Sequence, residues 1–384
     1  MRHCDRAWAE IDLDALLFNV NSIRERIDEK TKIIAVVKAD GYGHGASQIA
    51  RLLEGEERVW GYAVATAEEA FALRGDGIRK PVLVLGYTFP DSYERMIELD
   101  VRSTVFTCET ACALSDIAVK AGKKCMVHLK VDTGMCRIGV MPDGEGVALA
   151  QQIDALPGLE MEGIFTHFAT SDEADLTKAY RQLTLFREYA ARVEETLQRT
   201  IPMKHCSNSA GIVRMPEADM DAVRAGIILY GLWPSDVVQA DAGIALRPML
   251  SFNSSVVYVK TVPAGQEISY GGTYTTTRKT RVATICIGYA DGYPRSLSNI
   301  GHVLIRGHRA PILGRVCMDQ FMADVTDISA PVRVGEKVTL IGRDADAHIT
   351  MEELGELSGR FNYELACDIG KRIPRVYRLN DTLI

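Results

Sequence analysis

A lysine ends a short apolar run near the start of the chain. Lys38 lies close to the end of Ile33–Ala39 and is followed by the glycine-rich stretch Gly41–Gly45. The apolar residues predict a buried parallel strand, and α/β folds keep their active sites at the carboxyl ends of such strands. There a lysine can be desolvated, have its pKa lowered and attack a carbonyl carbon. The alternative is a lysine that extends from the strand end into solvent.

Two further groups of charged residues occupy strand-like runs. Arg224 stands inside the apolar run Val223–Gly231, where a guanidinium needs a strong acceptor, either in an internal ion pair or from a pyridine nitrogen. Lys130, Asp132 and Arg137 surround the end of another run. They form either a solvated or ion-paired rim, or a site where the planar fork of the arginine binds an oxygen anion.

Two histidines and several groups that suit a phosphate occur at the ends of other predicted strands. His167 and His205 end two strands, where a histidine is more often structural than catalytic. Ser209 and the stretch 224–227 follow the seventh and eighth strands, which is where (β/α)₈ barrels often bind phosphate. The phenol of Tyr42, in the glycine-rich turn, is a further phosphate donor.

Three residues of the later chain indicate no function when each is taken alone. Tyr270 and Tyr289 lie in glycine-bracketed segments and, taken alone, are ordinary turn tyrosines. Met318, in Arg315–Gln320, is a core residue by spacing alone, and this segment has no metal-ligand spacing. No metal site is expected.

Strand-like runs alternate with helical runs from residue 32 to about residue 233. This alternation predicts a (β/α)₈ barrel, with a doubly wound open sheet as the alternative. The expected strands are Ile33–Ala39, Trp60–Ala65, Pro81–Gly86, Arg102–Phe106, Cys125–Asp132, Leu159–His167, Met203–Ser207 and Val223–Gly231.

After Trp233 the chain becomes rich in valine, threonine and turn residues, which predicts an all-β domain. The strand-like run Ala7–Leu13 precedes the barrel and is expected to pair with that domain. We therefore expect an α/β protein with a barrel over residues 10–235 and a mainly β domain from residues 1–9 and 236–384.

Composition limits the function classes. The chain has 384 residues, 47% of them hydrophobic, and a net charge of −7, which does not favour nucleic acid as a partner. No apolar run is long enough to cross a membrane, and no signal peptide is visible. Nine irregularly spaced cysteines indicate reduced thiols and a cytoplasmic location.

Several of these segments, in the same order and across the whole chain, resemble bacterial alanine racemases. The matching segments are Val36–Gly45, Lys130–Gly139, Ser269–Tyr274, Ile287–Gly292, Arg315–Gln320 and Asn362–Glu364. The resemblance implies a fold-type III enzyme that depends on pyridoxal 5'-phosphate. It also implies a head-to-tail homodimer with shared active sites that interconverts L- and D-alanine and supplies D-alanine for peptidoglycan.

The resemblance also implies a role for each matching residue. Lys38 carries the Schiff base and is one of two acid/base groups, and Tyr270 of the partner subunit is the other. Arg224 faces the pyridine nitrogen, and His167 links Arg224 to Tyr270. The remaining roles are a phosphate cradle (Tyr42, Ser209, Gly226, Ile227, Tyr363), substrate contacts (Arg137, Met318) and an entrance gate (Tyr289).

Two positions near the expected substrate carboxylate differ among relatives. In several members of the family the lysine matching Lys130 is carbamylated and orients the arginine matching Arg137. Residue 136 is cysteine where many members have glycine.

Other functions of the same fold remain alternatives. Serine racemases of the glycopeptide-resistance type and broad-specificity racemases are the first, and Tyr363 favours alanine because its phenol narrows the pocket. Amino-acid decarboxylases share the fold, but Arg224 and Ser269–Tyr274 fit racemases better. A non-catalytic pyridoxal-phosphate homeostasis protein is the remote alternative, since such proteins are single barrels without a β domain.

Overall fold

The computed structural model describes residues 6–241 and 243–384. Residues 1–5, including Cys4 and part of the expected β domain, lie outside the described residues. The described residues form two compact units, one of residues 17–41, 45–241 and 243–247 and the other of residues 6–16, 42–44 and 248–384.

The first unit is built on an eight-stranded parallel sheet, all within the continuously described residues 32–225. Its strands are β2 (Lys32–Val36), β3 (Val59–Val64), β4 (Val82–Val84), β5 (Val101–Val105), β6 (Cys125–Lys130), β7 (Leu159–Phe165), β8 (Met203–His205) and β9 (Ala222–Ala225). The order runs from β8 back through β2 to β9, and backbone bonds Asp221 N–Lys204 O (3.1 Å) and Arg224 N–Ser207 O (2.9 Å) close the barrel. The expected barrel is confirmed, and the open sheet is wrong.

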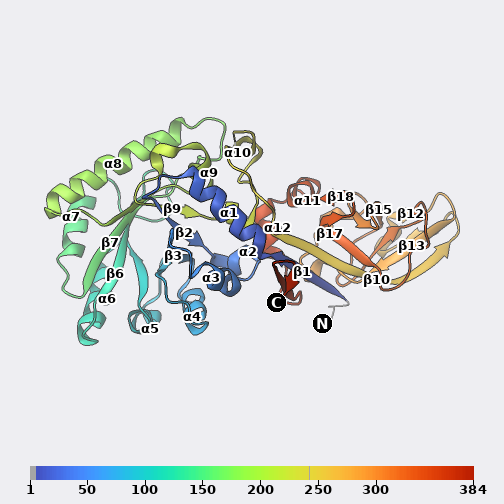
Figure 1. The fold of residues 1–384 in the computed structure, drawn as a ribbon, viewed down its shortest axis with the longest axis horizontal. Helices are drawn as coiled ribbons and strands as arrows, with labels where there is room; N and C mark the ends of the chain where they lie inside the picture. The colour runs from blue at the N-terminus through green and yellow to red at the C-terminus, as the bar shows by residue number, and fades with distance from the viewer. Residues whose placement is uncertain (1–5, 242) are drawn as a thin grey trace. The chain divides into compact units, whose positions relative to one another are not determined.

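Helices surround these strands (Figure 1). They are α1 (Leu13–Arg26), α3 (Ala46–Leu53), α4 (Ala67–Gly75), α5 (Tyr93–Glu98), α6 (Cys108–Lys120), α7 (Gly144–Asp154), α8 (Thr177–Leu197), α9 (Ser209–Arg214) and α10 (Asp236–Ala240). Side-chain caps begin several of them: Thr66, Thr107, Asp143 and Asn208 accept from the third amide of α4, α6, α7 and α9. Each cap lies between a strand and its helix, so the sequence itself marks where the chain turns back.

Two strand predictions extend three or more residues past the end of the observed strand. The run predicted as Ile33–Ala39 ends as a strand at Val36, and Lys38 begins the short segment α2 (Lys38–Tyr42). The run predicted as Val223–Gly231 ends at Ala225 and continues as the 3₁₀ helix η3 (Ile227–Tyr230). Apolar composition cannot mark these ends, because buried apolar residues continue past both of them, with Val37 after β2 and Ile227–Tyr230 after β9.

The second unit is mainly β. Its main sheet, formed by strands that all lie among the described residues, has the order β18-β17-β14-β15-β16-β13-β10-β1-β19-β20. The elements are β1 (Ala7–Asp12), β10 (Leu250–Val262), β11 (Glu267–Ile268), β12 (Tyr274–Thr275), β13 (Thr280–Ile285), β14 (His302–Ile305), β15 (His308–Leu313), β16 (Phe321–Asp324), β17 (Lys337–Asp344), β18 (Ala347–Ile349), α11 (Met351–Ser358), α12 (Asn362–Asp368), β19 (Arg375–Leu379) and β20 (Thr382–Leu383). β1 pairs antiparallel with β10 and parallel with β19, which confirms the predicted pairing of the N-terminal strand.

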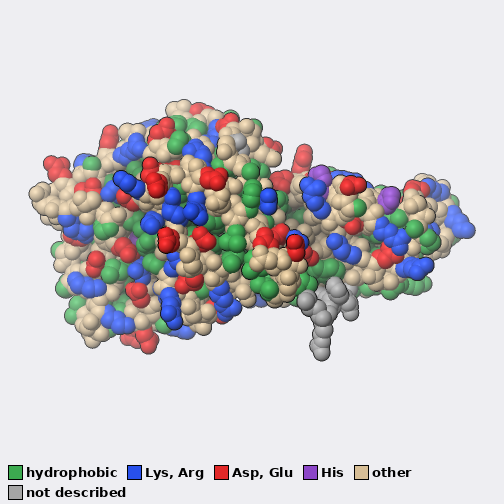
Figure 2. All heavy atoms as spheres, in the orientation of Figure 1, with side chains coloured by type: hydrophobic (Ala, Val, Ile, Leu, Met, Phe, Trp, Pro, Cys, Tyr) green, Lys and Arg blue, Asp and Glu red, His purple; other side chains and the backbone are tan. Residues whose placement is uncertain are grey.

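The surface mixes both signs of charge. Figure 2 shows acidic and basic side chains interspersed over the visible face. Within the described part of the chain, no helix is both long and apolar enough to cross a bilayer. Every cysteine that the structure describes is a free thiol.

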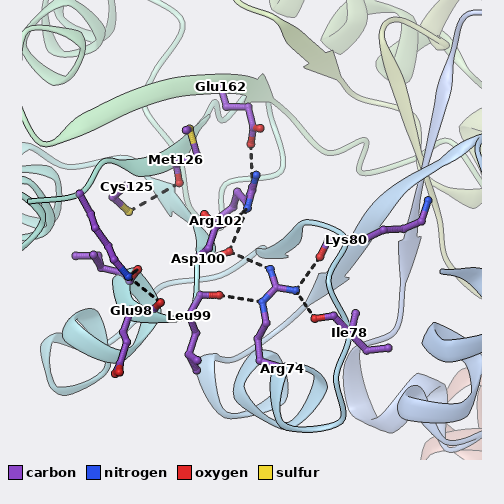
Figure 3. Close-up of polar contacts among 12 residues, drawn as sticks. Arg74, Ile78, Lys80, Glu98, Leu99, Asp100, Arg102, Cys125, Met126 and Glu162 are labelled. Atoms are coloured by element: carbon purple, nitrogen blue, oxygen red, sulfur yellow. Dashed lines mark hydrogen bonds and ion pairs between the residues drawn. The ribbon is translucent and has the colours of Figure 1, made fainter. Parts of the chain in front are cut away.

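Arg74 connects the loops at the amino ends of the barrel strands (Figure 3). Its guanidinium donates to the carbonyls of Leu99 (2.9 Å), Ile78 and Lys80 (both 2.8 Å), and Asp100 (3.0 Å). Burial lowers the pKa of this arginine, so these four acceptors replace water that the charge has lost. One side chain thus holds the loops before β4 and β5 together.

We expect Arg74→Met to destabilise the protein by about 2–3 kcal/mol, because several part-buried carbonyls lose their donor while the apolar stem is kept. Urea unfolding should show a lower midpoint with an unchanged slope. Arg79→Met is the matched control, since Arg79 is exposed in the same loop. A midpoint for Arg74→Met equal to that of the control would contradict the structural role of this guanidinium.

Candidate active site

Lys38 is positioned by a left-handed turn. The residues after it, from Ala39 to Tyr42, have φ values of 51°, 52°, 62° and 50°. Only glycine adopts this conformation without strain, so three of these four residues carry a cost of roughly 1 kcal/mol or more each. Such strain accumulates at functional sites, and here it turns the chain directly after the half-buried Lys38.

Hydrogen bonds maintain this turn. The Asp40 carboxylate accepts from Ala46 N (2.9 Å), its carbonyl accepts from Gly45 N (2.8 Å), and Glu69 accepts from Ala39 N (2.6 Å). Glu69 also completes the capping box of α4. The starts of α3 and α4 therefore fix the backbone that carries Lys38.

Arg224 lies buried in β9, next to the strand that leads to Lys38. Its register partner is Ile34 of β2. Nη2 donates to the carbonyls of Thr166 (2.7 Å) and Cys206 (2.9 Å), and Nη1 donates to His205 O (3.0 Å) and His205 Nδ1 (2.8 Å). Among the described residues no carboxylate lies within ion-pair distance of this guanidinium. The ion pair considered from the sequence is therefore wrong, because strand-end carbonyls and imidazoles supply the acceptors.

His167 follows β7 and contacts the same guanidinium. Its Nδ1 lies 3.2 Å from Arg224 Nη2, and burial, followed by the charge of Arg224, lowers its pKa far below the ordinary value. The ring is neutral at physiological pH, and because Nδ1 accepts, its proton lies on Nε2. Gln182 of α8 fixes this loop by donating to His167 O (3.1 Å) and accepting from Ala169 N (2.9 Å).

A set of phosphate-suited donors lies between α9 and η3. Ser209 Oγ accepts from Gly226 N (3.0 Å), so the serine hydroxyl hydrogen is directed to another acceptor. Ile227 begins η3, where an amide has no partner within the helix. The structure thus brings together Ser209, Gly226 and Ile227, as the sequence predicts.

Asp132 organises the loop that carries Arg137. Its carboxylate accepts from the amides of Gly134, Met135, Cys136 and Arg137 at 2.9–3.0 Å. Although burial opposes ionisation, these backbone bonds lower the pKa of Asp132. Cys136 has a φ of 55°, a conformation that glycine adopts more easily, so this position carries strain that a glycine would relieve.

Lys130, the last residue of β6, is buried beside this loop. Its Nζ donates to Val131 O (2.7 Å) and lies 5.4 Å from the centre of the Phe165 ring. Burial, followed by the charge of Arg224, lowers the pKa of the amine to about 7. At slightly alkaline pH the group is therefore mostly neutral and nucleophilic.

Tyr42 and Tyr363 lie together in the second unit. Their rings meet edge to face with centroids 5.9 Å apart, and burial strongly raises the pKa of Tyr42, which keeps its phenol protonated. A Cβ at position 43 would lie 2.1 Å from Ala366 O, so only glycine allows the turn to approach α12. The two predicted cradle tyrosines are thus neighbours.

Tyr270, Tyr289 and Met318 lie on exposed loops of the second unit. Their exposed fractions are 70%, 42% and 52%. Backbone bonds from Tyr289 N to Cys317 O (3.1 Å) and from Ala290 N to Met318 O (3.0 Å) join two of these loops, and Ser269 Oγ donates to Arg315 O (2.7 Å) from the third. An exposed apolar patch of this kind is typical of an interaction surface.

The residues of the barrel fit pyridoxal phosphate. A buried guanidinium whose Nη atoms are used by carbonyls and imidazoles leaves Nε–H for a ring nitrogen. A serine hydroxyl and helix-start amides suit the phosphate, and a lysine follows the adjacent strand. Fold and donors together define a barrel enzyme for this cofactor.

Comparison with known proteins agrees. Residues 11–234 match the family model described as the alanine racemase N-terminal domain, and residues 249–377 match the C-terminal domain. The alanine racemase of Halothermothrix orenii is 46% identical over 97% of this chain and 96% of its own. The solved alanine racemase of Clostridium difficile has a TM-score of 0.94 at 41% identity, covering 100% of this chain and 98% of its own. A histidine racemase of Leuconostoc mesenteroides has a TM-score of 0.89 at 32% identity, covering 97% and 98%.

The chain belongs to the alanine racemase family, which confirms the resemblance found in the sequence. Pyridoxal phosphate, expected from the same motifs, is the cofactor of this family. Both domain models match, so the single-barrel alternative does not fit this chain.

Sequence reasoning missed the buried partners of the site. His128 and Glu162 lie inside strands with no motif around them, and Gln182 lies within a long helix. The one available signal is Gly163, a glycine within a strand, which indicates that another group approaches closely. A Cβ there would lie 2.3 Å from His128 Nδ1.

We expect Lys130 to bind carbon dioxide, the neutral amine and CO₂ forming a carbamate with release of one proton. At constant CO₂ pressure, a ¹³C carbamate signal should rise as the pH passes upward through about 7, the pKa of this amine. Lys130→Met should remove the signal, and Lys124→Met, at an exposed lysine before the same strand, should keep it. A signal that survives Lys130→Met would place the carbamate on another amine.

Proposed function

We propose that this protein interconverts L- and D-alanine, with Lys38 and Tyr270 moving the Cα proton on opposite faces of the substrate. This activity would supply D-alanine for peptidoglycan in the cytoplasm. The observation that carries the proposal is the pairing of β2 and β9, in which Ile34 of the strand that leads to Lys38 lies opposite the buried Arg224. Family membership supplies the reaction.

The barrel residues would hold the cofactor and keep its charge state fixed. The Ser209 hydroxyl and the Ile227 amide would donate to the phosphate, with Ser209 Oγ held in place by the Gly226 amide, and Arg224 Nε would face the ring nitrogen. Burial lowers the pKa of Arg224 to about 10, so this group still carries its proton at neutral pH and leaves the ring nitrogen unprotonated. When bound, pyridoxal phosphate withdraws electrons from the amino acid and makes its Cα–H bond acidic.

Racemisation needs one group that accepts a proton and one that donates it from the opposite face. The Lys38 amine serves one face. A tyrosine phenol is a weak base at its reference pKa of about 10, so it needs nearby positive charge to serve the other. His167 Nε2–H, polarised by Arg224, is the donor that we assign to the Tyr270 oxygen. Arg137 binds the substrate carboxylate, Met318 lines the substrate site, and Tyr289 guards the entrance.

Tyr270 would come from a second copy of the chain. Its exposure of 70%, with the exposed Tyr289 and Met318 on adjoining loops, leaves a surface for another subunit to cover. A two-fold symmetric dimer places each such surface against the barrel of the partner and completes two sites at once.

The substrate side chain is the least constrained part of the proposal. The histidine racemase with the same fold shows that the architecture accepts other amino acids. Tyr363, packed on Tyr42, favours a small substrate over serine and larger amino acids. A chiral assay against L-alanine, L-serine and L-lysine separates the alternatives, and a preference for serine or lysine would contradict the assignment.

We expect borohydride reduction of the holoenzyme to leave a pyridoxyl group on Lys38, found by peptide mapping, with loss of racemase activity. Lys32→Ala, at an exposed lysine of β2, the strand that precedes Lys38, should label as wild type does, and Lys38→Ala should not label. A pyridoxyl group on another lysine would exclude Lys38 as the covalent attachment point.

We expect mixing of inactive Lys38→Ala with inactive Tyr270→Phe to restore activity. In a mixed dimer one site carries both lesions and the other carries neither. Random pairing makes about half of the dimers mixed, so activity should reach roughly a quarter of wild type.

The control mixes Lys38→Ala with Arg224→Leu, two lesions within the same barrel, and should restore nothing. Subunit exchange is verified separately with differently tagged chains. If exchange occurs and Tyr270→Phe still fails to complement Lys38→Ala, the two groups come from one chain and the shared-site assignment is wrong.

A further inference from the structure

A continuous set of hydrogen bonds runs inward from Arg224 through the barrel. Arg224 Nη1 contacts His205 Nδ1 (2.8 Å), and His205 Nε2 contacts His128 Nδ1 (2.9 Å). His128 Nε2 then contacts Glu162 Oε2 (3.3 Å), which also accepts from Arg102 Nε (3.3 Å). The five consecutive strands β5 to β9 supply one member each. We call these five residues the barrel relay.

The chemistry of the barrel relay allows one direction only. A guanidinium donates and never accepts, so His205 Nδ1 must be the acceptor. Burial lowers the pKa of both His205 and His128, so each ring is neutral and carries one proton. The proton of His205 is therefore on Nε2 and points to His128 Nδ1, and the proton of His128 is on Nε2 and points to Glu162. Every proton lies on the side toward the carboxylate.

The reverse arrangement is disfavoured at Arg224. If His128 carried its proton on Nδ1, His205 Nε2 would have to accept, and the proton of His205 would move to Nδ1. Two N–H groups would then face each other at Arg224 Nη1. An ionised Glu162 prevents this because a carboxylate only accepts. Although burial opposes its ionisation, contact with His128 and Arg102 lowers the pKa of Glu162.

The protein provides dedicated space for these rings. His128 and His205 have no exposed surface. Gly163 lacks the Cβ that would meet His128 Nδ1 at 2.3 Å, and Trp60 packs 5.7 Å from the His128 ring. His205 stacks on Phe165 with centroids 4.7 Å apart and planes 5° apart. Neither ring can turn without displacing its neighbours, so the hydrogen-bond pattern is tied to the packing.

The other end of the barrel relay reaches the loop that Arg74 holds. Figure 3 shows Glu162 and Asp100 on either side of Arg102, which donates to the Asp100 carboxylate at 2.7 Å. Asp100 is exposed and precedes β5. Arg102 and His128 therefore hold the same carboxylate oxygen of Glu162.

We propose that Glu162 is a positioning residue for racemisation, which through His128 and His205 fixes the ring tautomer that holds Arg224. The proposal rests on the assigned contact of Arg224 Nε with the cofactor ring. Arg224 has only neutral acceptors in direct contact, and Glu162, two imidazoles away and ion-paired with Arg102, is the carboxylate that orients the barrel relay. Without this carboxylate the tautomers of the two rings would no longer be fixed, and the guanidinium would be held less firmly at the ring nitrogen.

The wild-type protein provides the first test. In ¹⁵N-histidine-labelled holoenzyme at neutral pH, His205 and His128 should both appear as neutral rings protonated on Nε2. The spectra of His128→Gln and His205→Gln assign the signals. A ring protonated on Nδ1, or a doubly protonated ring, at either position would overturn the proposal, whatever the activity of the enzyme.

Glu162→Gln provides the second test, since the amide loses the charge and offers a donor as well as an acceptor. We expect a mixed tautomer at His128 and a kcat lowered about tenfold, the size of effect seen when an outer partner of a functional imidazole is lost. The KM for alanine should change less than about twofold, because substrate contacts are untouched. Glu162→Asp should recover part of the kcat.

Glu160→Gln, which neutralises an exposed carboxylate on the same strand, is the matched control and should behave as wild type. Wild-type kcat and unchanged histidine signals in Glu162→Gln would overturn the positioning role. If the wild-type holoenzyme does not racemise alanine, the proposed function fails while the tautomer result still stands. The two proposals therefore fail separately.

Discussion

The arrangement of the barrel site depends on how one buried cation is paired. Arg224 carries a charge into the interior, and its acceptors are the carbonyls at the ends of β7 and β8 and two neutral imidazoles. Buried backbone carbonyls need a hydrogen-bond donor, and the guanidinium supplies one to the carbonyls at the ends of β7 and β8. The group assigned to the cofactor is for this reason part of the barrel structure.

Burial and the charge of Arg224 together lower the pKa values of the neighbouring titratable groups. His167, His205 and Lys130 are buried, and Arg224 adds to the cost of protonating each of them. As a result two imidazoles stay neutral with fixed tautomers, and a lysine becomes a neutral amine near pH 7. Burial, reinforced by the charge of Arg224, thus keeps these groups neutral, which suits a reaction consisting of proton transfers.

The barrel could be predicted from the sequence because strand-like apolar runs alternate with helical runs. This pattern is visible without knowing which distant residues contact each other. The sequence also placed Lys38 and Arg224 in the first and the eighth of the expected strands. It failed where one residue depends on a distant one. The left-handed turn at 39–42 is stabilised by Glu69, and the acceptors of Arg224 are chosen by the register of three strands. His128 and Glu162 were missed for the same reason, since only the closed barrel brings them together.

Rigid and strained parts of the site have separate tasks. The barrel relay and its packed rings hold Arg224, the group that we assign to the ring nitrogen of the cofactor. The left-handed turn instead places strain next to Lys38, the residue that we assign to the covalent attachment of the cofactor. A residue that only holds charge benefits from dense packing, whereas a residue that exchanges protons and covalent partners needs a backbone that other groups hold in place. The hydrogen bonds of Asp40 and Glu69 hold the backbone around Lys38, because they join it to the first amide of α3 and to the start of α4.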